Sequence, residues 1–267
     1  MSLRKYLLLP QVLRLSLHAP RDQRQAWERY WSEIGSTGPG GQVLWDADVR
    51  GEIDATVGRL RVHGDMSLPL VDLGCGNGRQ ARTLAAYASR VVGLDAAESA
   101  VRRAADESED VPNAEFRQAD VAEPGHGDRL HAELGDVNVH VRGVLHVVDD
   151  AHRPAVVENI RAMVGDRGVV HLCETDVPGD ALEYLETQGA TPTSMPDVVR
   201  RLVAAGVRPP AHFGAGELAR YFPDAAWCVL ASGPTTMHGV PLTEGGPLQL
   251  IPSYFAVLRA KRGADLR

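Results

Sequence analysis

The stretch VDLGCGNGRQAR, residues 71–82, decides the fold. An apolar run ends in three alternating glycines, Gly74, Gly76 and Gly78, and residues with helical spacing follow. Glycine permits a tight turn and lets a ligand approach the backbone closely, and the start of the following helix supplies free N–H donors. The stretch therefore predicts a buried parallel strand, a glycine turn and a helix that together hold a ligand.

Strands and helices alternate on either side of this stretch. Such alternation indicates right-handed βαβ units and a mostly parallel sheet covered on both faces. Two further strands near the C-terminus are joined by a Gly-, Pro- and Thr-rich loop at 233–249, and without a helix between them they must pair antiparallel or not at all. The expected strands are 68–74, 90–95, 114–120, 137–145, 167–174, 226–232 and 250–262, and the expected helices of this region are 77–89, 97–108 and 151–165.

Two segments lie outside this pattern. Residues 1–64 are expected to form a helical arm, with a helix at 22–34 that Asp22 caps and another at 46–63. Residues 175–215, rich in proline and glycine around two short helices, are expected to be an insertion in a domain spanning 65–267. Long irregular segments often close over ligands, so both segments are predicted to form a lid.

Composition excludes several classes of protein. The chain has 267 residues, 44% of them hydrophobic and 24% charged, which is ordinary for a globular protein. A net charge of −7 and an aromatic content of 5% argue against a nucleic-acid-binding surface.

Cysteine usage and hydropathy bear on location. The three cysteines lie far apart with no CxxC pair, which excludes a disulfide scaffold and a cysteine zinc site and favours the reducing cytoplasm. No apolar run is long enough to span a membrane. The first 20 residues superficially resemble a secretory signal, but a proline and polar residues interrupt the apolar region. An amphipathic arm that packs on the body or on a second subunit, giving a homodimer, is the preferred interpretation.

The spacing of the glycines restricts the kind of ligand that the turn can bind. A dinucleotide site has the pattern G-x-G-x-x-G, whereas this turn reads G-x-G-x-G and is followed by Arg79. Asp72, two residues before the turn, would repel a pyrophosphate but suits an amino group. Asp95 ends the second expected strand, where a carboxylate can accept hydrogen bonds from ribose hydroxyls. Asp120 ends the third expected strand. Together, the glycine spacing and these three acidic residues favour a nucleoside with a zwitterionic tail as the ligand.

Four segments together resemble the class I S-adenosylmethionine-dependent methyltransferases. They are VDLGCGNGRQARTLA, VVGLDAAESAV, FRQADVAEP and VHVRGVLHVVDD, and the resemblance covers about 65–175. It implies a Rossmann-like, seven-stranded α/β sheet whose last strand is antiparallel, and S-adenosylmethionine as cofactor. It also implies these cofactor contacts: Asp72, Gly74, Gly76 and Gly78 at the methionine moiety, Asp95 with Ala96 at the ribose, Asp120 with Val121 at the adenine, and Arg142 with Gly143 beside the sulfonium. For Arg142 a structural role is an equal alternative, because Asn138, His140 and Arg142 give this strand one polar face.

Methyl transfer to a hydroxyl benefits from a general base, and histidine suits that role near neutral pH. His146 follows the fourth expected strand on the ligand side and is the first candidate, although a structural role is equally open. Glu174, at the end of the fifth expected strand, is the second candidate. His140 is expected to be a core histidine, and His152 to lie at the surface where a helix begins.

Aromatic residues gather in WERYW, residues 27–31. On a helix Trp27, Tyr30 and Trp31 share one face, where they either pack in the core or cover the ligand. With Trp45 and the insertion they would complete an apolar substrate pocket. No residues occur at the spacing of a metal site.

The sequence therefore predicts a cytoplasmic methyltransferase that acts on a small, largely apolar metabolite. The abundance of Ala, Arg, Gly and Pro is typical of a GC-rich bacterium and favours natural-product biosynthesis. Two alternatives stay open at this point. One is an enzyme of the same fold that binds S-adenosylmethionine but catalyses a cyclisation or rearrangement, and the other is a non-catalytic cofactor-binding subunit.

Overall fold

A seven-stranded sheet forms the centre of the molecule in a computed structural model that describes residues 3–47, 49–210 and 212–261. The strand order is β3-β2-β1-β4-β5-β7-β6. β1 to β5 are parallel, and β7 runs antiparallel to both of its neighbours, as expected of the last strand. The strands are β1 (Leu70–Leu73), β2 (Val91–Asp95), β3 (Ala114–Gln118), β4 (Asn138–Arg142), β5 (Val170–Thr175), β6 (Trp227–Gly239) and β7 (Gln249–Ala260).

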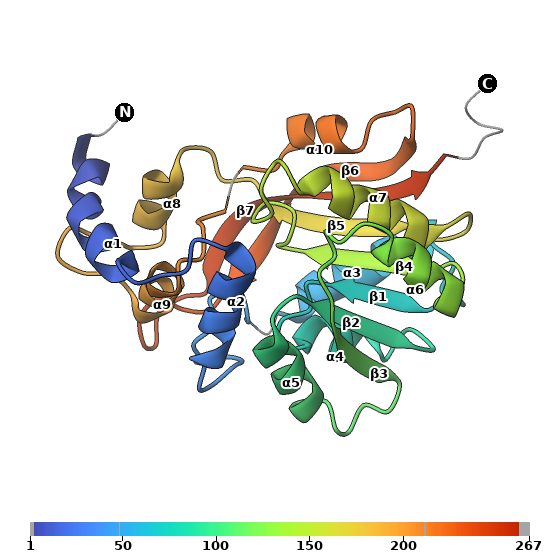
Figure 1. Ribbon diagram of the computed structural model, residues 1–267, viewed down its shortest axis with the longest axis horizontal. Coiled ribbons are helices and arrows are strands. Elements are labelled where there is room, and N and C mark those ends of the chain that lie inside the picture. The colour runs from blue at the N-terminus through green and yellow to red at the C-terminus, as the bar shows by residue number, and fades with distance from the viewer. Residues whose placement is uncertain (1–2, 48, 211, 262–267) are drawn as a thin grey trace.

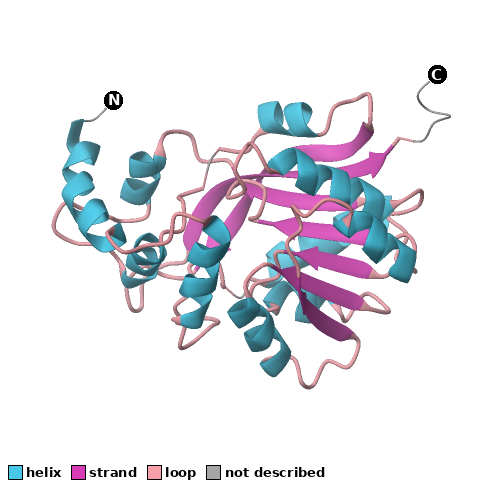
Figure 2. Cartoon of the chain, viewed as in Figure 1, coloured by secondary structure: helices cyan, strands magenta, loops and turns pink. Residues whose placement is uncertain are grey.

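Helices cover both faces of the sheet (Figure 2). Figure 1 shows α6 and α7 in front of the sheet and α3 behind it. The sequence patterns predict α3, α5, α7, α8 and α9, but not α6 or α10. The helices are η1 (Leu3–Leu8, a 3₁₀ helix), α1 (Leu9–Ser16), α2 (Gln23–Ser32), α3 (Arg50–His63), α4 (Arg79–Leu84), α5 (Glu98–Asp106), α6 (His126–Leu134), α7 (Arg153–Val164), α8 (Ala181–Thr187), α9 (Asp197–Ala205) and α10 (Ala215–Tyr221).

Local signals set several of these boundaries. The side chain of Asp22 accepts a hydrogen bond from the Gln25 N–H at 3.0 Å and caps α2, as predicted. α7 ends at Gly165, whose φ of 53° is costly for any residue with a side chain. α4 is shorter than the predicted helix 77–89, because the chain continues from it as tight turns in which Ala86 and Tyr87 bond back three residues.

The predicted loop 233–249 is wrong in extent. β6 runs on to Gly239 and β7 starts at Gln249, so only 240–248 connects them. Pro234 and the threonines beside it read as a loop in the sequence. β6 is an edge strand, however, and an edge tolerates a proline because its outer side needs no backbone donor.

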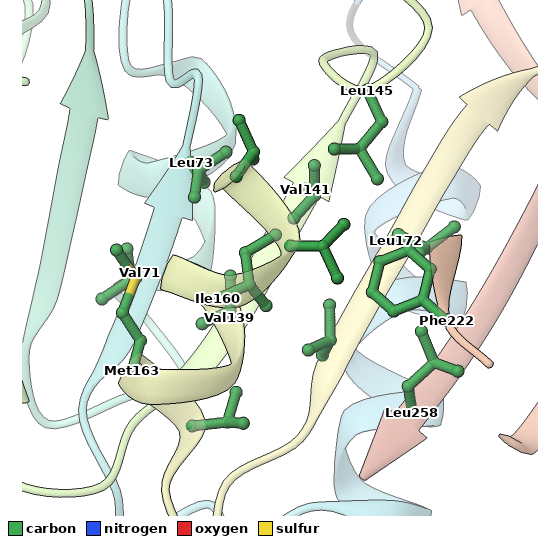
Figure 3. Close-up of a cluster of buried hydrophobic side chains, with 14 of the residues drawn as sticks. Val71, Leu73, Val139, Val141, Leu145, Ile160, Met163, Leu172, Phe222 and Leu258 are labelled. Atoms are coloured by element: carbon green, nitrogen blue, oxygen red, sulfur yellow. The ribbon is translucent and has the colours of Figure 1, made fainter. Parts of the chain in front are cut away.

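The apolar core lies between the sheet and α6, α7 and α10. β1, β4 and β5 send alternate residues into it, and Figure 3 shows Val71, Leu73, Val139, Val141 and Leu172 packed with residues of α7. This packing fixes the strands rigidly, so the loops at their carboxyl ends have a firm base.

The arm and the insertion pack together at the carboxyl ends of the strands. α1 and α2 contact α9, and η1 contacts α8 (Figure 1). One apolar cluster joins Leu8 of the arm to Leu185 and Val199 of the insertion. Lys5, fully buried, forms ion pairs with Asp180 and Glu183. We refer to 3–47 and 175–210 together as the cap. No described helix is long and apolar enough to cross a membrane.

Candidate active site

A cavity of about 680 Å³ lies between the carboxyl ends of the strands and the cap. Open α/β sheets bind ligands at this edge, where the strand order reverses direction. The glycine turn, the ends of β2, β3 and β4, helix α2 and the insertion all contribute to its wall. The structure therefore brings most of the predicted site residues to one place.

The glycine turn requires glycine for two physical reasons. Gly74 and Gly76 have φ angles of 75° and 54°, which residues with side chains rarely adopt. A Cβ on Gly74 would also collide with Val144, and one on Gly76 would lie 2.8 Å from the ring of Trp31. Both glycines line the cavity, so their backbone is open to a ligand.

Gly78 does not line the cavity. Its φ is 73°, and a Cβ there would lie 2.6 Å from Phe116. The structure therefore shows a packing role for Gly78, and its predicted cofactor contact stays a prediction. This glycine lets the start of α4 lie close to β3.

The acidic strand ends occupy different positions. Asp95 lines the cavity with Ala96, and its carboxylate accepts the N–H groups of Gly76 and Ala97, both at 2.9 Å. Burial raises the pKa of Asp95, although these N–H groups oppose the rise. Asp95 thus ties β2 to the glycine turn and still faces the cavity.

Asp120 and Val121 also line the cavity. One carboxylate oxygen of Asp120 accepts the Ala122 N–H at 3.0 Å, and the other pairs with Arg24 of α2 at 2.9 Å. Arg24 is 65% exposed, so this pair contributes little stability and can open. No sequence pattern indicates this contact between the cap and the end of β3.

Asp72 is buried beside the cavity rather than in its wall. It is 2% exposed, and its Oδ2 has no hydrogen-bond partner among the described residues. Burial raises the pKa of Asp72 to about 7. An unpaired buried carboxylate is costly unless a cation or a donor approaches it.

Arg142 and Gly143 end β4 and line the cavity. The Arg142 side chain pairs with Glu52 of α3 and donates to the carbonyls of Trp45 and His238 at 3.2 and 3.4 Å. Arg142 therefore connects the sheet, α3 and the loop that carries Trp45. These contacts give Arg142 a structural role, and because it also lines the cavity its predicted contact with the cofactor stays a prediction.

His146 lines the cavity and is held from behind by Glu174. The His146 Nδ1 lies 2.5 Å from Glu174 Oε2, and the Thr175 N–H approaches the same nitrogen at the longer distance of 3.3 Å. The shorter contact is a donation from Nδ1–H to the carboxylate, which leaves the lone pair on Nε2. A neutral histidine in this tautomer can accept a proton at Nε2.

Glu174 itself is fully buried and does not line the cavity. Its two oxygens also accept the backbone N–H groups of Val144, Leu145 and His146 at 3.0–3.2 Å. The prediction of Glu174 as a competing base is corrected by this geometry. The carboxylate positions the loop and the imidazole and does not reach a substrate.

The four predicted aromatic residues form one cluster. Their ring centroids lie 5.6 Å apart for Trp27–Trp45, Tyr30–Trp45 and Tyr30–Trp31. Trp27, Trp31 and Trp45 line the cavity. Tyr30 is 1% exposed and does not line it, so its predicted substrate contact is corrected to core packing.

Four further residues line the cavity that the sequence patterns did not single out. They are Thr175 at the end of β5, Tyr184 and Gln188 of the insertion, and Met237 of β6. Two buried oxygens among them, Thr175 Oγ1 and Gln188 Oε1, have no hydrogen-bond partner among the described residues. No motif or periodicity marks these positions, and Tyr184 and Gln188 lie at the cavity only because the insertion packs on the arm.

Comparison with known proteins agrees with this geometry. Residues 70–168 match a family model described as a methyltransferase domain. No curated protein matches the chain. Among solved structures, the chain is similar to an S-adenosylmethionine-dependent methyltransferase from Anabaena variabilis ATCC 29413, with 27% identity and a TM-score of 0.79 over 91% of this chain and 97% of that one.

Two more distant structures share the fold. One, described as converting a disulfide bond into a thioacetal group during echinomycin biosynthesis, is 22% identical with a TM-score of 0.62 over 89% and 90% of the chains. The other is magnesium protoporphyrin IX methyltransferase from Synechocystis PCC 6803 with bound S-adenosylhomocysteine, 18% identical with a TM-score of 0.53 over 80% and 83%. Residues 70–168 thus match a methyltransferase domain, and the chain is similar over most of its length to S-adenosylmethionine-dependent methyltransferases, in agreement with the sequence motifs.

Proposed function

We propose that this chain transfers the methyl group of S-adenosylmethionine to a hydroxyl group of a small, largely apolar metabolite, with His146 as general base. One observation carries the proposal. The imidazole of His146 is held by a buried carboxylate in the tautomer that leaves Nε2 free, and it lines the same cavity as the glycine turn and Asp95.

The residues present suit the cofactor. The Gly74–Gly76 turn offers open backbone to the methionine moiety, and Asp95 offers a carboxylate to the ribose. Asp120 would receive the adenine once Arg24 moves aside. The unpaired Oδ2 of Asp72 makes this region attractive to the cationic amino group. The bound cofactor supplies an activated methyl group, so the chain mainly has to align the acceptor and remove its proton.

His146 removes that proton in the proposed mechanism. Nε2 takes it from the acceptor hydroxyl as the oxygen bonds to the methyl carbon, and the imidazole becomes positively charged. The methyl–sulfur bond of the bound cofactor would break in the same step and leave its electron pair on sulfur. Glu174 stabilises this charge through Nδ1–H and holds the ring orientation. Glu174 is therefore a positioning residue.

The acceptor class follows from the cavity wall. Trp27, Trp45, Leu185 and Val199 give it apolar surface. Gln188 Oε1 has no hydrogen-bond partner among the described residues, and an unsatisfied buried oxygen costs about 1–3 kcal/mol. A hydrogen-bond donor on the substrate would satisfy it. A flat or branched apolar molecule with a hydroxyl and a second hydrogen-bond donor fits these demands. The similarity to the protein of echinomycin biosynthesis supports a natural product as the acceptor.

The cap is proposed to act as a lid. Its contacts with the body include the exposed Arg24–Asp120 pair, which can break without large loss of stability. Limited proteolysis should cut 3–47 or 175–210 more slowly when S-adenosylhomocysteine is bound. Cleavage rates that ignore the cofactor would contradict a lid coupled to cofactor binding.

A homodimer in the cytoplasm completes the proposal. The arm exposes Leu7, Leu13 and Leu17, which are 59%, 64% and 72% exposed. A second copy that covers these leucines would remove apolar surface from water. Light scattering of the wild type and of Leu13→Glu tests this, and a wild type that stays monomeric at high concentration would refute it. The free cysteines, two of them buried, are consistent with a reducing compartment.

The activity is tested with methyl-labelled S-adenosylmethionine and a panel of apolar hydroxyl compounds. Label in the product supports methyl transfer, whereas conversion without label supports a rearrangement. His146→Gln should lower turnover about 10²–10⁴-fold, which is the usual contribution of a general base, and should leave the affinity for S-adenosylhomocysteine unchanged.

Two further variants complete the experiment. His152→Gln is the matched control, because this second imidazole at the cavity is exposed and pairs with Asp149, and turnover should barely change. Glu174→Gln should also lower turnover, because the imidazole loses the carboxylate that orients it. If His146→Gln keeps nearly full turnover and the wild-type pH profile, His146 is structural and the acceptor is a nucleophile that needs no base.

A further inference from the structure

A second cavity, of about 340 Å³, lies on the other face of the sheet, between α3, β4 and β6. Arg59 of α3, His140 of β4 and two threonines of β6, Thr235 and Thr236, contribute to its wall. Arg142 separates it from the main cavity and lines both. The methyltransferase reaction proposed above uses none of the other four residues.

A pair of buried histidines forms the floor of this region. His140 and His171 are 1% and 0% exposed, their rings stack with centroids 5.3 Å apart, and their Nδ1 atoms lie 3.2 Å apart. Burial lowers the pKa of His140 to about 4, and burial also lowers the pKa of His171 well below its ordinary value. Both rings are therefore neutral, and one Nδ1 donates while the other accepts.

Arg59 decides which nitrogen carries each proton. Its guanidinium lies 3.5 Å from His171 Nε2, and arginine can only donate. His171 Nε2 therefore accepts, its proton lies on Nδ1, and that proton is donated to His140 Nδ1. The remaining proton of His140 must lie on Nε2. This nitrogen is buried and has no hydrogen-bond partner among the described residues, although its residue lines the second cavity.

The charge of this cavity is positive. Arg59 stacks on the ring of Phe255 at 3.6 Å, and no carboxylate of the described residues lies within ion-pair distance of it. Glu52 also lines the cavity, but Arg142 balances its charge and the N–H of His238 donates to it at 3.0 Å. The wall of this cavity thus contains one guanidinium without a carboxylate partner, two threonines, and a histidine whose buried Nε2–H has no acceptor among the described residues.

We propose that the second cavity binds a small oxyanion, a carboxylate or a phosphate, through the Nε2–H of His140 and the guanidinium of Arg59. The anion accepts the proton that His140 presents and neutralises Arg59. Such charge-assisted hydrogen bonds are about twice as strong as neutral ones. A threonine hydroxyl in the cavity wall can donate to one of its remaining oxygens.

The test uses the whole protein labelled with ¹⁵N-histidine, titrated with inorganic phosphate and separately with acetate at constant ionic strength. The ring signals should show Nε2–H for His140 and Nδ1–H for His171. One of the two anions should shift the His140 Nε2 signal until it saturates, which identifies the oxyanion.

Two variants on α3 make the result specific. Arg59→Met should lower the affinity for the anion that saturates the wild type at least tenfold. Arg61→Met is the matched control, because Arg61 also stacks on an aromatic ring, that of Tyr87 at 5.2 Å, but does not line the cavity. It should bind the anion as the wild type does.

Three results would overturn the proposal. They are the absence of a saturable shift with either anion, equal affinities in the two variants, and a His140 proton on Nδ1. Should Arg59→Met fail to fold, the wild-type titration and the two tautomers still decide the question.

Discussion

The two faces of the sheet bury different chemistry, and β4 shows the contrast within five residues. Val139 and Val141 enter the apolar core beneath α7 (Figure 3), whereas His140 and Arg142 face α3. The neighbouring strands repeat the contrast. Leu73 and Leu172 face the core, and Asp72 and His171 point to the opposite side.

The difference separates stability from function. The apolar face gains free energy from burial and close packing, which is insensitive to pH. Buried charges on the other face gain little net stability, because removing them from water offsets their attraction. They do fix geometry, since Arg142 links β4 to Glu52 of α3. We therefore expect substitutions on the apolar face to lower the stability of the fold, and substitutions on the polar face to change binding or the pH dependence of stability.

The largest expected effect lies on the apolar face. Leu172→Ala should lower the free energy of unfolding by about 2–5 kcal/mol, because it leaves a cavity in a core where Leu172 is fully buried. Urea denaturation at pH 5 and pH 8 should show the same loss at both values. A loss that depends on pH would show that the two faces are not independent.

The second-largest expected effect is a loss of ligand affinity at the carboxyl ends of the strands, where the two faces of the sheet meet. Asp95→Ala should weaken the binding of S-adenosylhomocysteine by about 1.5–3 kcal/mol, since it removes charge-assisted hydrogen bonds. Calorimetric titration measures this. The control is Asp136→Ala, because Asp136 precedes β4 at the opposite edge of the sheet and bonds the Arg167 N–H. Unchanged affinity in Asp95→Ala would remove this residue from the ribose.

The smallest effect has the opposite sign. The pKa of Asp72 is about 7 in the folded protein, against an ordinary value of 3.8. Between these values the native state holds a proton that the unfolded chain has lost, so the stability of the wild type falls as pH rises through this window. This loss amounts to about 4 kcal/mol at pH 8. Asp72→Asn removes it but leaves an amide without hydrogen-bond partners in the same buried place, at a cost of about 1–3 kcal/mol, so the variant should be about 1–3 kcal/mol more stable than the wild type at pH 8.

Urea denaturation across pH 4–8 checks this expectation. The control is Asp65→Asn, because Asp65 precedes β1 and hydrogen bonds with Ser67 lower its pKa to about 2. That variant should retain the fall in stability between pH 4 and 7. The idea fails if Asp72→Asn retains it too.

Much of the sheet could be predicted because its signals are local. The glycine turn, the acidic residues at the strand ends and the N-terminal capping of α2 by Asp22 each depend on a few adjacent residues. Even the odd polar face of β4 was visible as Asn138, His140 and Arg142. The extent of β6 was not, since an edge strand can carry Pro234 and therefore looks like a loop.

The parts that escaped prediction depend on contacts distant in sequence. His146 was singled out, but its partner Glu174 was interpreted as a rival base, because only the pairing of β4 with β5 reveals that one supports the other. Gln188 carried no signal at all. Its position depends on how α8 packs against the arm, and no periodicity encodes that.

The ion pairs of Lys5 have a consequence for synthesis of the chain. Lys5 is separated from Asp180 by 175 residues. At roughly 5–20 residues per second, the arm leaves the ribosome about 10–35 s before its partners in the insertion exist. During that time Leu8, which is fully buried in the finished protein, stays exposed together with the leucines of α1. The nascent arm therefore exposes apolar surface until the insertion has been made and can cover it.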